Sequence, residues 1–270
     1  LMTKYPGIAY FKWDCNSPIT NIYSAYLKDK QGQLYIDHVR GVYNVLKRVK
    51  ANYPNVPMML CSGGGARCDY EALKYFTEFW CSDNTDPVER VYIQWGFSQF
   101  FPAKAMDAHV TSWNKATSIK FRTDVASMCK LGFDIGLKEL TADELTYCQT
   151  AVANWKRLQN AIMDGDQYRL VSPYEGNHMA LNYVSKDANK AVLFAYDIHP
   201  RFQEKLLAVK LQGLDPNKQY KVEEINLMPA ASSGLAVNGK VYSGDYLMKV
   251  GLDVFGLGQT QSRVVELTAQ

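Results

Sequence analysis

Two aspartates stand where an apolar segment of the chain gives way to a polar cluster. Asp14 lies in the run KWDCN (residues 12–16), directly after the apolar stretch GIAYF (residues 7–11). Asp83 lies in the run WCSDNTD (residues 80–86). Buried parallel strands whose carboxyl ends open into an active site have this pattern. Two carboxylates that face each other over such a site are the arrangement for glycoside hydrolysis, one acting as nucleophile and one as acid.

The neighbours of each aspartate separate the candidates. The ammonium group of Lys12 favours the ionised form of Asp14, as a nucleophile requires. Taken alone, the two residues are explained more simply as a structural ion pair at a strand end. Asp86 has a structural explanation, because it is followed by Pro and then Glu in the pattern of a helix N-cap. Asp83 has none. It is expected two strands beyond Asp14, and alternate strands of a parallel barrel converge over the same mouth.

A glycine-rich run, CSGGGAR (residues 61–67), follows another predicted strand. Its glycines would let a ligand approach the backbone, and they would serve a simple tight turn as well. The run lacks the Gly-Lys-Ser/Thr and G-x-G-x-x-G patterns of phosphate loops. Arg67 and Asp69 are expected to orient other carboxylates or to pair with each other. His109, beside Asp107 at the end of a further strand, is a candidate for binding a hydroxyl group or a hydrogen-bonded structural histidine.

These candidates need a parallel sheet to hold them, and the first 165 residues alternate apolar strands with amphipathic helices, which favours an α/β fold. The strands are expected near 6–13, 57–61, 100–105 and 132–137, with one more ending near 80–83. The helices are expected from Ile36 to Val49, from Pro87 onward, and from the capping box TADE (residues 141–144) to Gly165.

The repeated polar clusters at strand ends predict a (β/α)8 TIM barrel over residues 1–165. About five of its strand units are recognisable, and a barrel is not expected to carry a catalytic carboxylate so near residue 1. The chain is therefore expected to contain only the C-terminal portion of the barrel.

Short alternating strands replace this pattern in residues 166–270, and they predict a small antiparallel β-sandwich. The run NG at 238–239 is a signal for a two-residue hairpin turn. The strands are expected at 178–185, 190–198, 206–214, 219–225 and 262–268.

Composition excludes some classes of function. The net charge of +3 and the absence of a basic stripe argue against nucleic-acid binding, and no stretch is apolar enough to span a membrane. The six cysteines have no zinc-site spacing and are expected to be reduced thiols. No signal peptide is visible, and the sequence leaves the choice between cytoplasm and periplasm open.

Taken together, these runs resemble the α-galactosidases of glycoside hydrolase family 36, especially the Bacteroides-type enzymes. KWDCN (12–16) is similar to the family's K-W-D-x-N nucleophile motif and CSGGGAR (61–67) to its C-x-G-G-G substrate loop. WCSDNTD (80–86) is similar to W-x-S-D-[DN]-T-D, and MDAHV (106–110) to M-x-A-H-V. Asp107 and Ala66 depart from the usual residues, and the N-terminal domain and early barrel strands of the family have no counterpart here.

The resemblance implies roles for individual residues and a retaining double displacement without metal or organic cofactor. Asp14 would be the nucleophile and Asp83 the general acid/base, with carboxyl groups about 5–5.5 Å apart. The residues implied to contact galactose are Lys12, Asn16, Cys61, Gly63 and Gly64.

The implied substrates are terminal α-galactosides of the melibiose and raffinose type, with no nucleic acid or membrane partner, and a homo-oligomer is one expectation for the assembly. The alternatives are an α-N-acetylgalactosaminidase, a transglycosylase, and a fragment that lacks catalytic competence and acts as a carbohydrate-binding or structural module.

Overall fold

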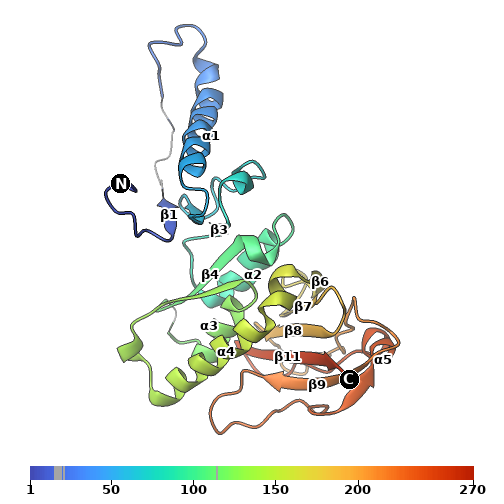
Figure 1. Cartoon of the computed structure of the whole chain (residues 1–270). Helices are drawn as coiled ribbons and strands as arrows, with labels where there is room; N and C mark the ends of the chain where they lie inside the picture. The colour runs from blue at the N-terminus through green and yellow to red at the C-terminus, as the bar shows by residue number, and fades with distance from the viewer. Residues whose placement is uncertain (15–19, 21, 114) are drawn as a thin grey trace. The chain divides into compact units, whose positions relative to one another are not determined.

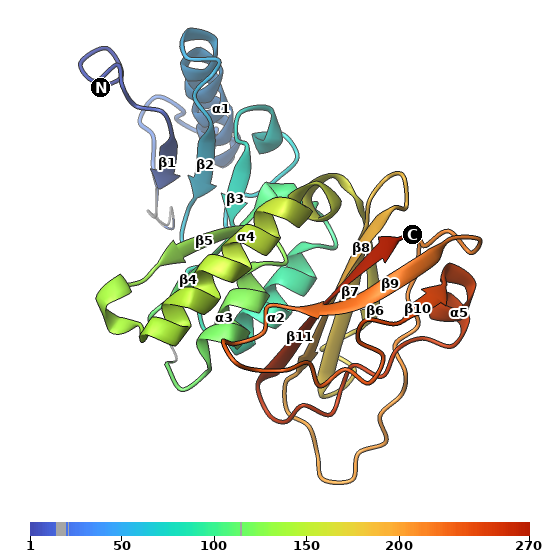
Figure 2. The same cartoon turned by 60° about the horizontal axis from the view of Figure 1, so that its bottom comes forward.

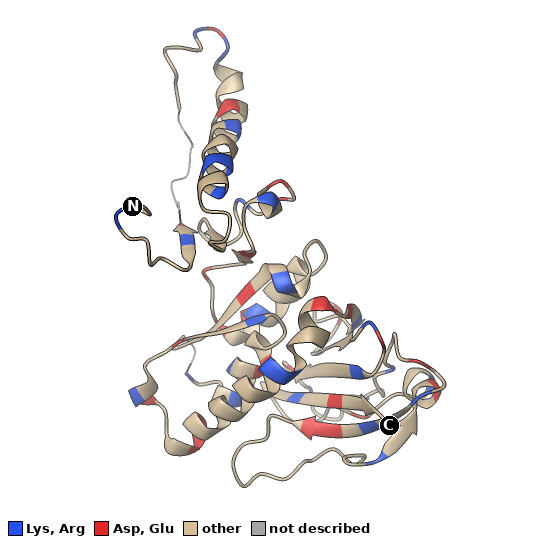
Figure 3. Cartoon of the chain, viewed as in Figure 1, with Lys and Arg blue, Asp and Glu red and all other residues tan. Residues whose placement is uncertain are grey.

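The computed structural model of the chain describes residues 1–14, 20, 22–113 and 115–270. The chain forms two compact units, Leu1–Asp83 and Asn84–Gln270 (Figure 1). Charged residues of both signs occur in each unit (Figure 3), in keeping with the small net charge. No helix among the described residues has the length and apolar composition needed to cross a membrane.

The first unit contains three parallel strands, in the order β1, β2, β3, and one long helix, α1. The elements are β1 (Phe11–Asp14), the 3-10 turn η1 (Gln31–Gln33), α1 (Leu34–Asn52), β2 (Met58–Cys61), the 3-10 turn η2 (Ala72–Lys74) and β3 (Glu78–Trp80). The helical spacing seen from Ile36 to Val49 is confirmed by α1. All four residues of β2 are buried, as expected for a strand paired with a neighbour on each side.

The second unit begins with two parallel strands, β4 and β5, and three helices. Helices α3 and α4 contact these strands and also the large sheet that follows, so they lie between the two (Figure 2). The elements are α2 (Pro87–Phe97), the 3-10 turn η3 (Ala103–Ala105), β4 (Met106–Thr111), α3 (Ile119–Ala126), β5 (Lys130–Asp134), the 3-10 turn η4 (Leu137–Glu139) and α4 (Ala142–Asp164).

Both helix caps predicted from the sequence are confirmed. The Asp86 side chain accepts hydrogen bonds from the backbone N–H groups of Val88 and Glu89, at 2.9 and 3.3 Å. At the start of α4, Thr141 and Glu144 form a reciprocal capping box. Each cap satisfies N–H groups that lack partners within the helix, which fixes the residue at which the helix begins.

The rest of the second unit is built around a six-stranded antiparallel sheet in the order β10, β9, β11, β8, β7, β6. One face packs on α3 and α4. Buried apolar side chains of the strands, including Leu193 and Val265, share a core with Leu211, Leu247 and Val254 of the following segments. The elements are β6 (Asp166–Val171), β7 (His178–Val184), β8 (Lys190–Asp197), β9 (Gln219–Ile225), β10 (Val241–Ser243), α5 (Gly244–Lys249) and β11 (Gln261–Ala269).

A fully buried carboxylate, that of Asp124, joins the helices to this sheet. It accepts hydrogen bonds from Tyr147 of α4, Asn226 and Ser262 at 2.9, 2.9 and 2.7 Å. Lys120 lies one helical turn away and pairs with it at 2.6 Å. A buried charge is tolerated only when it is paired and fully hydrogen-bonded, so these contacts require the helices and the sheet to pack in one arrangement.

Four expectations for the fold are wrong. The strand expected at 100–105 lies later, as β4, and 103–105 is the 3-10 turn η3. Residues 206–214 form no strand: Val209 makes an isolated bridge to Leu252, and the segment is otherwise irregular.

The other two concern the predicted sandwich. Its second sheet is not found in the described part of the chain, where helices and irregular segments cover the faces of a single sheet. Gly239 does lie in a turn, at φ 76°, but the strands that pair around it, β9 and β10, are separated by residues 226–240 rather than by two residues.

Candidate active site

Strand β1 presents Lys12 and Asp14 on one face of the first unit's sheet. Exposure alternates along the strand, with Lys12 and Asp14 exposed and Phe11 and Trp13 half-buried. Successive side chains of a strand point to opposite faces, so the two charged residues share a face. Phe11 and Trp13 share the other, where their ring centroids are 6.0 Å apart.

The same face continues onto β2 and β3. Asp14 is paired in register with Cys61, the last residue of β2. Met59, Cys61 and Trp80 pack together as a buried cluster. The ammonium group of Lys12 lies 5.3 Å from the centroid of the Trp80 ring, within the range of a cation–π contact. The carboxyl ends of three parallel strands therefore place Lys12, Asp14, Cys61 and Trp80 around one region.

Asp83 is attached to this region by two side chains. The indole Nε1–H of Trp80 donates a hydrogen bond to Asp83 Oδ1 at 3.0 Å. The Cys61 thiol donates to the same oxygen at a sulfur–oxygen distance of 3.9 Å. Asp83 itself is exposed, so its carboxyl group is held by the strands and remains accessible from solvent.

The glycine-rich turn after β2 packs against the backbone that carries Asp83. Gly63 and Gly64 have φ values of 58° and 80°, in the left-handed region that favours glycine. A Cβ atom on Gly64 would lie 2.6 Å from Ser82 Cα and 3.1 Å from Asp83 N. The turn and the Asp83 segment are thus in direct contact, and a side chain at position 64 would separate them.

On the expectation that Asp83 is catalytic, Gly64→Ala in the full-length protein should lower kcat/KM for an aryl α-galactoside by roughly 10²-fold, since a displacement of about 1 Å in a catalytic group has effects of that size. Gly41→Ala is the matched control, because a Cβ atom at Gly41 of α1 meets nothing within 4 Å. Steady-state kinetics of both variants would measure the difference. Equal activity of the two variants would contradict a role for the Gly64 contact in placing Asp83.

The Cys61 thiol is influenced by the charged groups of the site. Burial raises the pKa of Cys61, the negative charges of Asp14 and Asp83 act in the same direction, and the Gly64 N–H and the charge of Lys12 oppose them. The net shift is upward, so the group is a neutral S–H donor at neutral pH.

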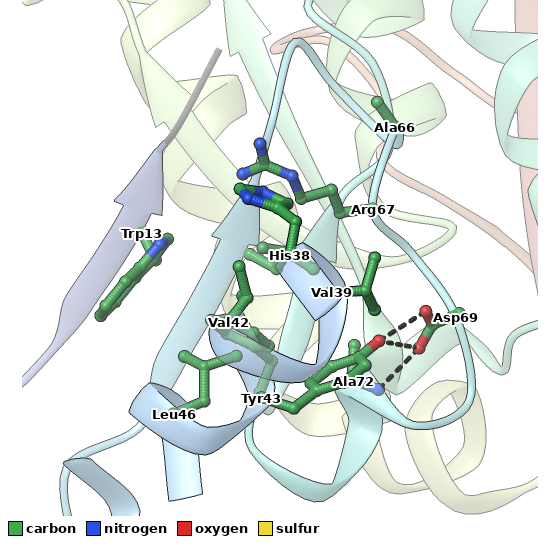
Figure 4. Close-up of a pocket in the computed structure, with 12 residues that line it drawn as sticks. Trp13, His38, Val39, Val42, Tyr43, Leu46, Ala66, Arg67, Asp69 and Ala72 are labelled. Carbon is green, nitrogen blue, oxygen red and sulfur yellow. Dashed lines mark hydrogen bonds between the residues drawn. The ribbon is translucent and has the colours of Figure 1, made fainter. Parts of the chain in front are cut away.

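The opposite face of the sheet lies toward α1. A pocket of about 170 Å³ lies between α1 and the strands, and Trp13, Leu46 and Arg67 are among the residues that line it (Figure 4). At its edge the carboxylate of Asp69 accepts hydrogen bonds from the Tyr43 hydroxyl and the Ala72 N–H. Asp69, expected to orient carboxylates or to pair with Arg67, instead ties α1 to the segment after the glycine turn.

Of the residues singled out from the sequence, Lys12, Asp14, Cys61, Gly63, Gly64 and Asp83 lie in the first unit. Asn16 lies outside the described residues. His109 and Asp107 belong to the second unit, where His109 Nε2 lies 3.6 Å from Asp107 Oδ1. The His109 ring packs directly on Gly132, where a Cβ atom would lie 2.3 Å from the ring.

Sequence reasoning missed the contact of Trp80 with Asp83, although Trp80 stands three residues before Asp83 in the same run. The described residues contain no cluster of His, Cys, Asp and Glu that could hold a metal ion. The five cysteines that the structure describes form no disulfide with one another, and Cys15 lies outside the described residues.

Comparison with known proteins gives two family matches. Residues 1–165 match the model of the melibiase family, and residues 178–267 match that of the glycosyl hydrolase family 36 C-terminal domain. Alpha-galactosidase 1 of Pediococcus pentosaceus is 33% identical over 256 residues, which are 93% of this chain and 33% of that protein. Alpha-galactosidase AgaA of Geobacillus stearothermophilus is 33% identical over 251 residues, 91% of this chain and 32% of that protein.

Solved structures agree with these matches. The family 36 α-galactosidase AgaB of Geobacillus stearothermophilus aligns with a TM-score of 0.87 at 33% identity, over 97% of this chain and 35% of its own. A doubly substituted AgaA in complex with raffinose aligns with a TM-score of 0.86 at 31% identity, over 97% of this chain and 36% of its own. The chain thus spans about a third of the length of these relatives. With the melibiase model covering its first 165 residues and the family 36 C-terminal model most of the remainder, the chain belongs to the melibiase family, glycoside hydrolase family 36.

Proposed function

We propose that the protein containing this chain is a retaining α-galactosidase that removes terminal α-D-galactosyl residues from oligosaccharides of the melibiose and raffinose type. One observation carries the proposal: the carboxyl ends of β1, β2 and β3 bring Lys12, Asp14, Cys61 and the Asp83 carboxyl group to one face of the sheet. Relatives named α-galactosidases, one of them solved with raffinose, support the substrate class.

In the first step, a carboxylate oxygen of Asp14 attacks the anomeric carbon and the bond to the aglycone oxygen breaks. Asp83 gives its proton to that oxygen as it leaves, so the aglycone departs as a neutral alcohol. In the second step, Asp83 takes a proton from water, whose oxygen attacks the anomeric carbon and displaces Asp14. Two inversions give net retention, and this mechanism requires carboxyl groups about 5–5.5 Å apart.

The remaining proposed site residues bind the sugar. Lys12, Asn16, Cys61, Gly63 and Gly64 contact the galactose, with the Lys12 ammonium and the neutral Cys61 thiol as hydrogen-bond donors to hydroxyl groups. The left-handed backbone at Gly63 and Gly64 leaves room for the ring to approach main-chain groups. None of these contacts requires a metal or an organic cofactor.

We also propose the domain assignment that fits this chemistry. Residues 1–165 would be part of a (β/α)8 barrel, whose other strands are supplied by sequence outside residues 1–270, and residues 166–270 a C-terminal β domain. The ranges of the two matching family models and the threefold greater length of the relatives support this division.

The test is hydrolysis of an aryl α-galactoside and of raffinose by the full-length protein. NMR would identify which anomer of galactose is released first. We expect both substrates to be cleaved with α-galactose as the first product. Residues 1–270 alone, assayed in parallel, should show no turnover if the pocket needs the rest of the barrel. Three outcomes would contradict the proposal. Preference for an aryl α-N-acetylgalactosaminide would indicate an α-N-acetylgalactosaminidase, and transfer products without hydrolysis would indicate a transglycosylase. Binding without turnover would indicate a carbohydrate-binding module.

A further inference from the structure

We propose that Trp80 is a positioning residue that determines which oxygen of Asp83 carries the transferable proton. The inference rests on the proposed role of Asp83 as general acid/base. It adds a function for a buried tryptophan that has no direct part in the double displacement.

The geometry of the hydrogen bonds separates the two carboxyl oxygens of Asp83. The Trp80 Nε1–H donates to Oδ1 at 3.0 Å, and the more distant Cys61 thiol donates to the same Oδ1. Oδ2 carries neither of these bonds. An indole N–H is only a donor, so it binds an unprotonated oxygen best, and the acid proton is directed to Oδ2. The proton given to the leaving group, and later the one taken from water, therefore passes through Oδ2.

The same bond favours the step in which the proton leaves. A hydrogen bond from N–H to a carboxylate is stronger than one to a neutral carboxyl group. The Trp80–Asp83 bond therefore gains strength as Asp83 gives up its proton, and an interaction that is stronger in the transition state than in the ground state accelerates the reaction.

Trp80 is itself held in place, as a positioning residue must be. It is the last residue of β3, is 6% exposed and packs on Met59 and Cys61. Its ring also lies beside the Lys12 ammonium, 5.3 Å from the centroid. The direction of the indole N–H is thus set by a strand, whereas Asp83 lies in the loop that follows.

The test is Trp80→Phe in the full-length protein, assayed on raffinose and on 2,4-dinitrophenyl α-galactoside. Loss of a hydrogen bond to a charged group should lower kcat/KM for raffinose roughly 10- to 100-fold. The loss on the dinitrophenyl substrate, whose leaving group needs no proton, should stay below about 3-fold. Trp155→Phe is the matched control, because its indole N–H donates to the Cys129 carbonyl at 2.9 Å within the second unit.

If Trp80→Phe does not fold, 3-benzothienylalanine at position 80 keeps the ring shape and replaces N–H by sulfur. A loss of equal size on both substrates would overturn the proposal, because it would indicate a structural role only.

A double-mutant cycle separates this inference from the function on which it rests. If Trp80 acts through Asp83, adding Trp80→Phe to Asp83→Ala should have no further effect on raffinose hydrolysis. Should Asp83→Ala show its leaving-group dependence while Trp80→Phe adds its full loss in that background, the positioning role fails and the acid/base role stands. Should Asp83→Ala show no leaving-group dependence at all, the assignment of Asp83 fails first.

Discussion

Replacing Asp14 by Asn in the full-length protein is expected to lower kcat on an aryl α-galactoside by at least about 10⁴-fold, the order seen when a covalent nucleophile is removed. An amide has no charge with which to attack the anomeric carbon, and the galactosyl–enzyme ester cannot form. The Lys12 and Cys61 groups on the same face remain, so binding should change far less than turnover. Steady-state kinetics with KM and kcat resolved would measure this.

A second variant at the same position identifies the role of the carboxylate. With Asp14→Gly, azide can enter the vacated space and attack the anomeric carbon directly, which should restore turnover and give β-galactosyl azide by a single inversion. Asp37→Asn on the exposed start of α1 is the control for the loss of one negative charge. Asp14 would not be the nucleophile if Asp14→Asn kept a tenth or more of the activity.

Replacing Asp83 by Ala should give a loss that depends on the leaving group. General acid catalysis contributes roughly 10²- to 10⁴-fold, so raffinose hydrolysis should fall by that factor. A 2,4-dinitrophenyl leaving group departs without a proton, so the first step on that substrate should be nearly unchanged. The second step still needs a base, so galactosyl–enzyme should accumulate as a burst. Stopped-flow release of dinitrophenol would record it.

Azide distinguishes the two aspartates here as well. Azide needs no general base, so in the Asp83→Ala variant it should react with the accumulated galactosyl–enzyme to give α-galactosyl azide. The Asp14→Gly variant should give the opposite anomer, β-galactosyl azide. Asp86→Ala is the control from the same run of sequence: it removes an N-cap and should cost about 1 kcal/mol in the free energy of unfolding. Equal losses of kcat/KM, which reports the first step, on both substrates for Asp83→Ala would count against an acid role.

The sequence predicts helix caps correctly because these features depend on residues close together in the chain. Asp86 could be separated from Asp83 by the Pro and Glu that follow it, and the structure gives Asp86 its two capping hydrogen bonds. The capping box at Thr141 and Glu144 starts α4 for the same reason. Helix caps and strand alternation depend on neighbours a few residues away, which the sequence displays directly.

The secondary-structure predictions are wrong where contacts with residues distant in sequence determine the structure. Residues 206–214 are apolar enough for a strand, yet Val209 and Leu211 take backbone partners from residues 247–252 and bury their side chains in the core without joining the sheet. Helix α3 was missed because it is only 8 residues long and its position is fixed by Asp124 and its contacts with α4 and the sheet. Strand β6 and helix α5 were missed as well.

The sequence by itself determined which groups are available: the KWDCN run, the glycine turn and the WCSDNTD run identified Asp14, Gly64 and Asp83 and placed each at a strand end. Only the tertiary structure decided how they meet. The register of β1 on β2 sets Asp14 beside Cys61, the missing Cβ of Gly64 allows the turn to touch the Asp83 backbone, and the Trp80 indole selects one oxygen of Asp83. Such contacts join different strands, and their geometry depends on sheet register and side-chain packing, which no short stretch of sequence encodes.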